Sequence, residues 1–166
     1  KQHIQFLKWL LDEITIPNDI LAKFLVTFSG VSGIADKDNY SKKIRIKNKF
    51  KDCNVYIFEI GSIKIQEIDG YQVHHEITNN FTEYIQSEDD LLNDLETLIS
   101  LVPHNKKIIF QSHFRPDIIY NNESKIINNR TIIYNTLCRL PGHKHVEGYP
   151  LSPIIIHDPS YFIKEN

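Results

Sequence analysis

Several residues that could carry acyl chemistry stand directly after apolar, strand-like segments of this chain. Ser32 and Gly33 close one such segment, and Gly61 and Ser62 close another. Glycine lets the backbone turn sharply and present N–H groups closely to a ligand, as an oxyanion site requires. A simple turn is the alternative interpretation of both loops, because Gly and Ser are common turn residues.

Histidine, arginine and aspartate follow two later strand-like segments. His113 and Arg115 come after one of them, and His157 and Asp158 come after the other. Ligands of open parallel sheets bind beyond the carboxyl ends of the strands, so we expect these side chains at one edge of a sheet. Imidazole suits proton transfer, and guanidinium suits a carboxylate or phosphate. A site that uses the two histidines with Asp158 and no serine is an alternative, and a turn-capping Asp158 is a plainer one.

The segments that position these residues alternate between helical and strand patterns. Apolar residues at helical spacing predict helices over 2–14, 37–51, 87–101 and 122–139, with a short helical piece after Asp19. Runs of β-branched and aromatic residues predict strands at 24–28, 54–64, 107–112 and 154–156. This alternation predicts an α/β fold, a three-layer α/β/α sandwich with a mainly parallel, flavodoxin-like sheet.

Three segments support sharper predictions. Residues 54–64 form a short apolar run, which is typical of a strand buried on both faces at the centre of a parallel sheet. The pair Asp69-Gly70 between two strand-like segments predicts a β-hairpin, inserted after that strand. Ser87, followed by three acidic residues, predicts the N-cap of a helix.

Two histidine pairs, His74 with His75 and His143 with His145, contain residue types that ligate metals. Neighbouring residues on a strand point to opposite faces, which separates the first pair. The second pair lies in a Gly/Pro-rich stretch that predicts a loop, without a further ligand pair at a recognised spacing. We therefore assign no metal site.

The composition bounds the class of protein. A chain of 166 residues, 41% of them apolar, can bury one core without disulfides, and its two cysteines lack CxxC spacing. Reduced thiols and a cytoplasmic location are therefore expected. A net charge of −2 gives no basic footprint, so we predict no nucleic-acid partner, and no segment predicts a membrane span. The sequence starts at Lys1 and contains no Met, so we expect a single domain over 1–166 from a longer chain.

Two of the glycine loops carry a resemblance to a known family. The segment Phe28-Ser-Gly-Val-Ser-Gly-Ile34 resembles the second conserved block of the SGNH/GDSL hydrolase superfamily, with Gly33 at the glycine whose N–H helps form the oxyanion hole. Phe58-Glu-Ile-Gly-Ser-Ile-Lys64 is similar to the third block, Gly-x-Asn-Asp. Gly61 matches that block, and Ile63 stands where the family has its oxyanion asparagine.

The resemblance extends to the last strand and stops at the ends of the chain. Ile156-His-Asp-Pro-Ser160 is similar to the strand that precedes the family's Asp-x-x-His block. The nucleophile block Gly-Asp-Ser and the Asp-x-x-His block have no counterpart in this sequence. An inactive SGNH-like scaffold that binds a glycan or a protein is therefore the alternative to an enzyme.

What the resemblance implies is an esterase or acyltransferase that acts on an acyl group of a carbohydrate or similar substrate through a serine acyl-enzyme. The residues that it implies as catalytic are Gly33, Gly61 and Ser62, with Ser62 replacing the lost asparagine as a donor. Those implied to bind the substrate, a small molecule or glycan, are Ser32, His113, Arg115, His157 and Asp158. No cofactor is implied, and acetyl-coenzyme A would be the acyl donor of a transferase.

Overall fold

The computed structural model describes residues 2–25, 40–73, 80–113, 125–145 and 154–160. The chain divides into two compact units. The first unit comprises Lys1–Cys53 and Lys64–Ile85, and the second comprises Asn54–Ile63 and Gln86–Asn166. The predicted single domain over the whole chain stays a prediction.

The first unit contains the helices α1 (Gln2–Leu10), α2 (Asn18–Leu25) and α3 (Tyr40–Asp52). The predicted helix over 2–14 ends earlier, at Leu10. The predicted strand at 24–28 is wrong at its first two residues, which belong to α2, and its other residues lie outside the described part of the chain. The helix extends through Leu25 because Asp19 lies favourably in its first turn, while Ile20 and Leu21 are buried.

An ion-pair cluster joins α3 to Asp12, in the turn after α1. Asp12 has a positive φ of 66°, and its carboxylate accepts hydrogen bonds from Lys43 and Lys47 of α3. These two hydrogen bonds, that from Lys43 first, lower the pKa of Asp12 to about 2. Lys43 also lies over the Trp9 ring, with Nζ 4.6 Å from the ring centroid. The ion pairs of Asp12 and the cation–π contact with Trp9 thus link α3 to α1 and the turn after it.

The small sheet of the first unit has the order β3-β2-β4 and is antiparallel. Its strands are β2 (Lys64–Ile68), β3 (Tyr71–Gln72) and β4 (Thr82–Ile85). The predicted hairpin is confirmed: Asp69 and Gly70 have φ of 51° and 80°, as a tight two-residue turn requires. Strand β4 was not predicted, since only four residues form it and its side chains are mostly exposed.

One glutamine side chain completes the edge of this sheet. The Gln5 amide of α1 accepts a hydrogen bond from the backbone N–H of Gln72 at 2.9 Å and donates one to the Gln72 carbonyl at 3.2 Å. A neighbouring strand would make the same pair of bonds to this residue. The Gln5 side chain therefore attaches α1 to β3 through the two hydrogen bonds that a neighbouring strand would otherwise make.

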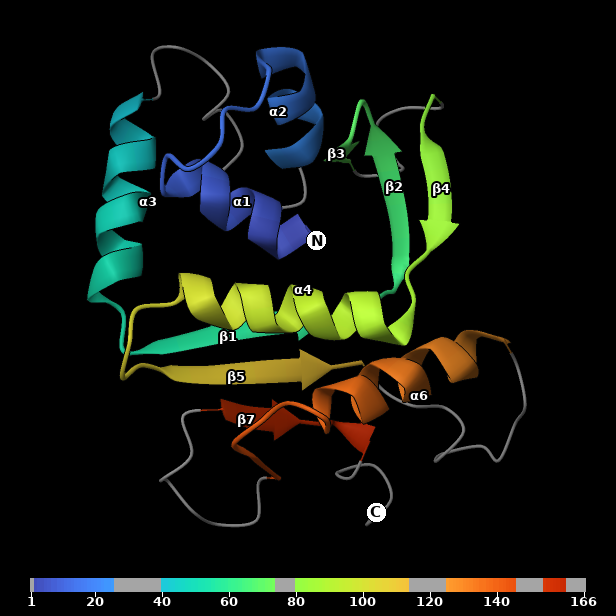
Figure 1. Cartoon of the computed structure of the whole chain (residues 1–166). Coiled ribbons are helices and arrows are strands. Elements are labelled where there is room, and N and C mark those ends of the chain that lie inside the picture. The colour runs from blue at the N-terminus through green and yellow to red at the C-terminus, as the bar shows by residue number, and fades with distance from the viewer. Residues whose placement is uncertain (1, 26–39, 74–79, 114–124, 146–153, 161–166) are drawn as a thin grey trace. The chain divides into compact units, whose positions relative to one another are not determined.

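The second unit contains a parallel sheet (Figure 1). Among the described residues its strands have the order β1-β5-β7-β6. Their bounds are Val55–Ile60 for β1, Lys107–Ser112 for β5, His143–His145 for β6 and Ile154–His157 for β7. The predicted α/β class is confirmed, as is the strand at 107–112. The loop predicted around His143 and His145 is wrong, because these residues pair in parallel with β7.

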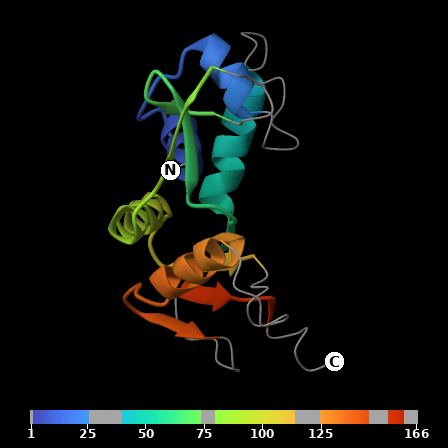
Figure 2. The same ribbon diagram turned by 90° about the vertical axis from the view of Figure 1, so that its right-hand side faces the viewer.

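Two helices of this unit, α4 (Glu88–Leu101) and α6 (Lys125–Leu137), pack against each other on one face of the parallel sheet (Figures 1 and 2). Successive right-handed crossovers that progress in one direction place their helices on the same face. The core between helices and sheet is built from Leu91, Leu95 and Leu98 of α4, Ile133 and Leu137 of α6, and Tyr56, Phe58, Ile108, Phe110, Ile154 and Ile156 of the strands.

Strand β1 differs from its prediction. Buried and exposed residues alternate along it, and it lies at the edge of the sheet as described. Val55 and Ile57 point to the face opposite the helices and are exposed. An apolar run alone does not distinguish a strand buried on both faces from one whose second face is exposed, which is why the prediction of burial on both faces was wrong. Among the described strands, β1 has a neighbour on one side only.

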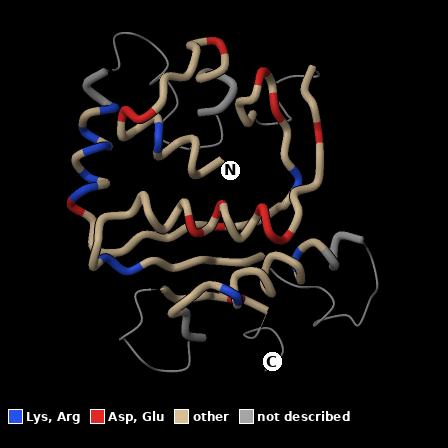
Figure 3. The backbone as a smooth tube through the Cα atoms, in the orientation of Figure 1, with Lys and Arg blue, Asp and Glu red and all other residues tan. Residues whose placement is uncertain are grey.

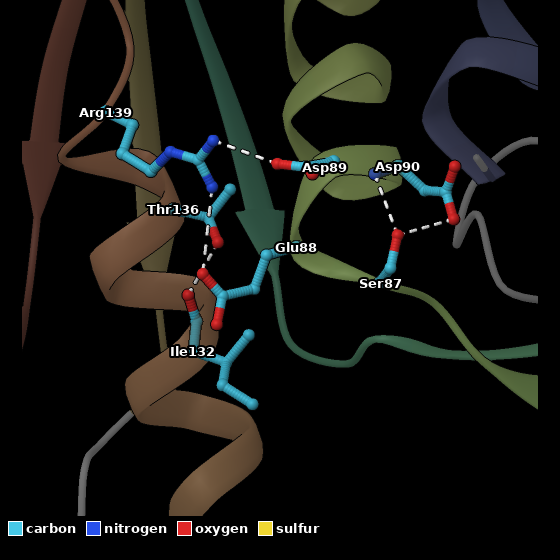
Figure 4. A network of polar contacts seen from close by, with 7 residues as sticks. All are labelled: Ser87, Glu88, Asp89, Asp90, Ile132, Thr136 and Arg139. Atoms are coloured by element: carbon cyan, nitrogen blue, oxygen red, sulfur yellow. Dashed lines mark hydrogen bonds and ion pairs between the residues drawn. The ribbon is translucent and has the colours of Figure 1, made fainter.

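The start of α4 is fixed by polar contacts (Figure 4). Ser87 is confirmed as the N-cap: its hydroxyl accepts a hydrogen bond from the Asp90 N–H at 3.1 Å. Arg139, just after α6, approaches Asp89 at 3.0 Å and Glu88 at 3.7 Å. Figure 3 shows acidic residues along α4 and basic residues along α3, so each of these helices carries mainly one sign of charge.

Candidate functional site

The carboxyl end of the parallel sheet brings a row of polar residues together. Glu59 of β1 is paired in register with Gln111 of β5, and Gln111 is paired with His157 of β7. Residues in register on neighbouring strands share a face of the sheet, and residues two apart on one strand do as well. The polar row therefore lies on the same face as Val55 and Ile57, opposite α4 and α6.

Gly61 and His113 are in direct contact at this edge. A Cβ built on Gly61 would lie 2.6 Å from Nε2 of His113 and 3.0 Å from its Cδ2. Real Cβ atoms do not tolerate such distances, so the imidazole occupies the space that a side chain at residue 61 would need. Glycine allows the imidazole to approach the backbone this closely, and any larger residue at position 61 would displace the ring.

The second partner of His113 is Glu59. Nε2 of the imidazole lies 2.7 Å from Oε1 of the carboxylate, and the side chains are 38% and 60% exposed. When Nε2–H is donated to Glu59, Nδ1 keeps its lone pair and can accept a proton. A base oriented by a carboxylate is the arrangement that activates nucleophiles in acyl-transfer enzymes.

The opposite face of the same edge is buried. Asp158 follows β7 and accepts a hydrogen bond from the Ser160 N–H at 2.9 Å, so it caps the turn, as the plainer interpretation predicted. Ser112, the last residue of β5, is 1% exposed, and its hydroxyl has no hydrogen-bond partner in the described part of the chain. His157 and Asp158 point to opposite faces, so they do not act as one pair.

The predicted site residues fall into three groups. Gly61 and His113 are in contact at the carboxyl edge predicted from the strand ends, and His157 lies at the same edge on β7, in register with Gln111. Ser62 directly follows Gly61 and is exposed. The residues that lie outside the described part of the chain are Ser32, Gly33 and Arg115.

Ile63 occupies the position of the asparagine in the family that the sequence resembles. Its side chain is 1% exposed and packs in the core. It therefore offers no donor to an oxyanion and does not face a ligand. Any oxyanion site at this edge needs donors from other residues.

Glu59 and Gln111 were missed by the sequence analysis. Glu59 is the single charged residue within an otherwise apolar strand and stands two residues before Gly61, so that strand periodicity places both on one face. That pattern was the available signal. No signal in the sequence indicated the contact between Glu59 and His113, since it depends on the parallel pairing of β1 with β5.

Other features bear on the class of site. No group of three or more potential metal ligands converges within the described residues. Cys53 and Cys138 are not joined in a disulfide. No helix in the described ranges is long and apolar enough to cross a membrane.

Comparisons with known proteins identify no family for this chain. No family model, curated protein or solved structure matches it. The fold and the edge of the sheet described above therefore carry the argument about function.

Proposed function

We propose that this protein is an esterase or acyltransferase, SGNH-like in its layout, which acts on the acyl group of a carbohydrate or similar ester at the carboxyl edge of the parallel sheet. The observation that carries the proposal is the contact of His113 with Glu59 at 2.7 Å, above Gly61. An imidazole held by a carboxylate at a strand end can serve as a general base.

The sequence resemblance gives Ser62 the role of an oxyanion donor; here we assign it the role of nucleophile instead, because it is the exposed hydroxyl that directly follows Gly61. Nδ1 of His113 takes the proton of the Ser62 hydroxyl as the oxygen attacks the acyl carbonyl, and Nε2–H stays donated to Glu59. The protonated imidazole then gives its proton to the leaving alkoxide, which leaves an acyl-enzyme. Water releases the acid in a hydrolase, and an acceptor hydroxyl or amine takes the acyl group in a transferase. Gly33, which the sequence resemblance implies as the oxyanion donor, lies outside the described part of the chain.

The test combines turnover with covalent labelling. The full chain is incubated with p-nitrophenyl acetate before and after a fluorophosphonate, and the labelled peptide is identified by mass spectrometry. We expect a label on Ser62, and a loss of turnover of at least about 100-fold in Ser62→Ala and His113→Gln. Ser100→Ala and His104→Gln, which change an exposed serine and an exposed histidine away from the edge, are the matched controls.

A label on another serine, or turnover that survives His113→Gln, would contradict the roles assigned to these residues. Absence of both label and turnover would remove the enzyme proposal.

A second candidate function is a catalytically inactive scaffold that binds a glycan or a protein. The observation that favours it is the burial of Ile63, since the family's oxyanion amide has no equivalent in that side chain. Binding to a glycan array without turnover, weakened by His113→Gln and unchanged by His104→Gln, would support the scaffold. Ester turnover that depends on Ser62 would exclude it.

A further inference from the structure

A strip of isoleucines crosses the open face of the parallel sheet beside the polar row. Ile57 of β1 is in register with Ile109 of β5, which is in register with Ile155 of β7. Ile57 is 64% exposed, although isoleucine side chains are usually buried. The other two are half-buried.

Polar residues bound the strip on its carboxyl side, and on its amino side Lys107 bounds it on β5 while the exposed Val55 extends it on β1. Towards the carboxyl end lies the polar row Glu59, Gln111 and His157, and towards the amino end Lys107 is exposed on the same face. Two spacings of about 4.8 Å between strands make the strip roughly 10 Å long across the sheet. It is one residue wide on β5 and two residues wide on β1, where Val55 is exposed beside Ile57. A strip this narrow is too small for a stable protein interface, which needs about 800 Å² on each partner.

We infer that this strip binds the aliphatic chain of the acyl group, with the carbonyl end at Glu59, Gln111 and His113. This inference rests on the proposed function and names its substrate class as esters of medium-length fatty acids. The positions of the polar row and the isoleucine strip set the orientation of the acyl group. Amide and imidazole groups can bind its carbonyl at the carboxyl edge, and the isoleucines beside them can remove its methylene groups from water. A short acyl group such as acetyl would not reach the strip.

The experiment compares p-nitrophenyl acetate, butyrate and octanoate with the full chain. Each buried methylene raises the affinity for the transition state about fourfold, so we expect kcat/KM to rise at least tenfold from acetate to octanoate. In Ile57→Ser the ratio of octanoate to acetate kcat/KM falls about tenfold. Ile85→Ser removes an equally exposed isoleucine from β4 and is the matched control, with the ratio unchanged.

The results of these experiments can contradict the acyl-chain strip without contradicting the proposed esterase. Turnover of all three esters without dependence on chain length overturns the inference and leaves the esterase in place. If no ester is turned over, the binding of dansyl-undecanoic acid, followed by its fluorescence, tests the strip. Binding that octanoate competes with and that Ile57→Ser weakens would support the inference. Absence of binding would overturn it. A large fall of Tm in Ile57→Ser, absent in Ile85→Ser, would show that the rest of the chain covers the strip, and would also overturn the inference.

Discussion

The imidazole of His113 rests on the Cα of Gly61, at a distance that leaves no room for a Cβ. Gly61→Ala therefore has to move the ring and with it the contact to Glu59. A shift of about 1 Å in a catalytic group costs on the order of 100-fold in rate, so ester turnover should fall by that amount. The free energy of unfolding should change by less than about 1 kcal/mol, because the half-exposed ring can turn towards solvent.

Gly70→Ala is the opposing control for Gly61→Ala. Gly70 has a φ of 80° and no neighbour within 4 Å of a built Cβ. Alanine at this φ costs about 1–2 kcal/mol of stability, measured by urea unfolding, and should leave turnover unchanged. Equal losses of stability and turnover in Gly61→Ala would make Gly61 a packing residue only.

Glu59 acts through His113 and is a positioning residue. Glu59→Gln keeps an oxygen that can accept the Nε2–H hydrogen bond but removes the charge that stabilises the protonated imidazole. We expect kcat for p-nitrophenyl acetate to fall about tenfold or more with KM unchanged. The control is Glu96→Gln on the exposed side of α4. A rise of KM at constant kcat would instead assign Glu59 to substrate binding.

The buried hydroxyl of Ser112 offers a stability test. It has no hydrogen-bond partner among the described residues, so Ser112→Ala removes no bond and should change the free energy of unfolding by less than about 0.5 kcal/mol. Ser87→Ala removes a hydroxyl that does cap a helix and should cost about 1 kcal/mol. Urea unfolding of both variants is the measurement. A loss above about 1 kcal/mol in Ser112→Ala would contradict the absence of a partner.

Asp12 predicts a pH dependence of stability. The pKa of its carboxyl group is about 2 in the folded protein, below its ordinary value of 3.8, so folding favours the ionised carboxylate. This stabilisation is complete above pH 3.8 and is lost as the pH falls to about 2. Its size stays below about 1 kcal/mol, because the Asp12 side chain is 53% exposed and solvent screens the pair.

The check is urea unfolding of Asp12→Asn against the parent chain between pH 7 and pH 2. Asparagine tolerates a positive φ, so the variant removes the charge and keeps the backbone. The stability difference should be constant from pH 7 to about pH 5 and vanish near pH 2. Asp69→Asn makes the same substitution at the other described aspartate with positive φ, which has no ion pair among the described contacts, and is the matched control. A difference that persists at pH 2 would refute the ion-pair origin.

Local signals in the sequence predicted the elements that depend on local chemistry. The cap at Ser87 and the turn at Asp69-Gly70 were confirmed because a few neighbouring residues determine each of them. The end of α2, the pairing of β6 and the place of β1 among the described strands depend on contacts with distant residues, and the sequence patterns did not contain them. The candidate site was predicted in part: the strand ends indicated Gly61, His113 and His157, but the partner of His113 required the register of β1 and β5.

The amide of Gln5 has a consequence for association. A strand at a sheet edge offers its N–H and C=O groups to any extended chain, and such edges nucleate aggregates. At Gln72 both groups are already bonded to Gln5, so an intruding strand would have to displace the side chain first. α1 thereby protects the backbone of β3 at Gln72, and fraying of this first helix would expose these groups to pairing with another chain.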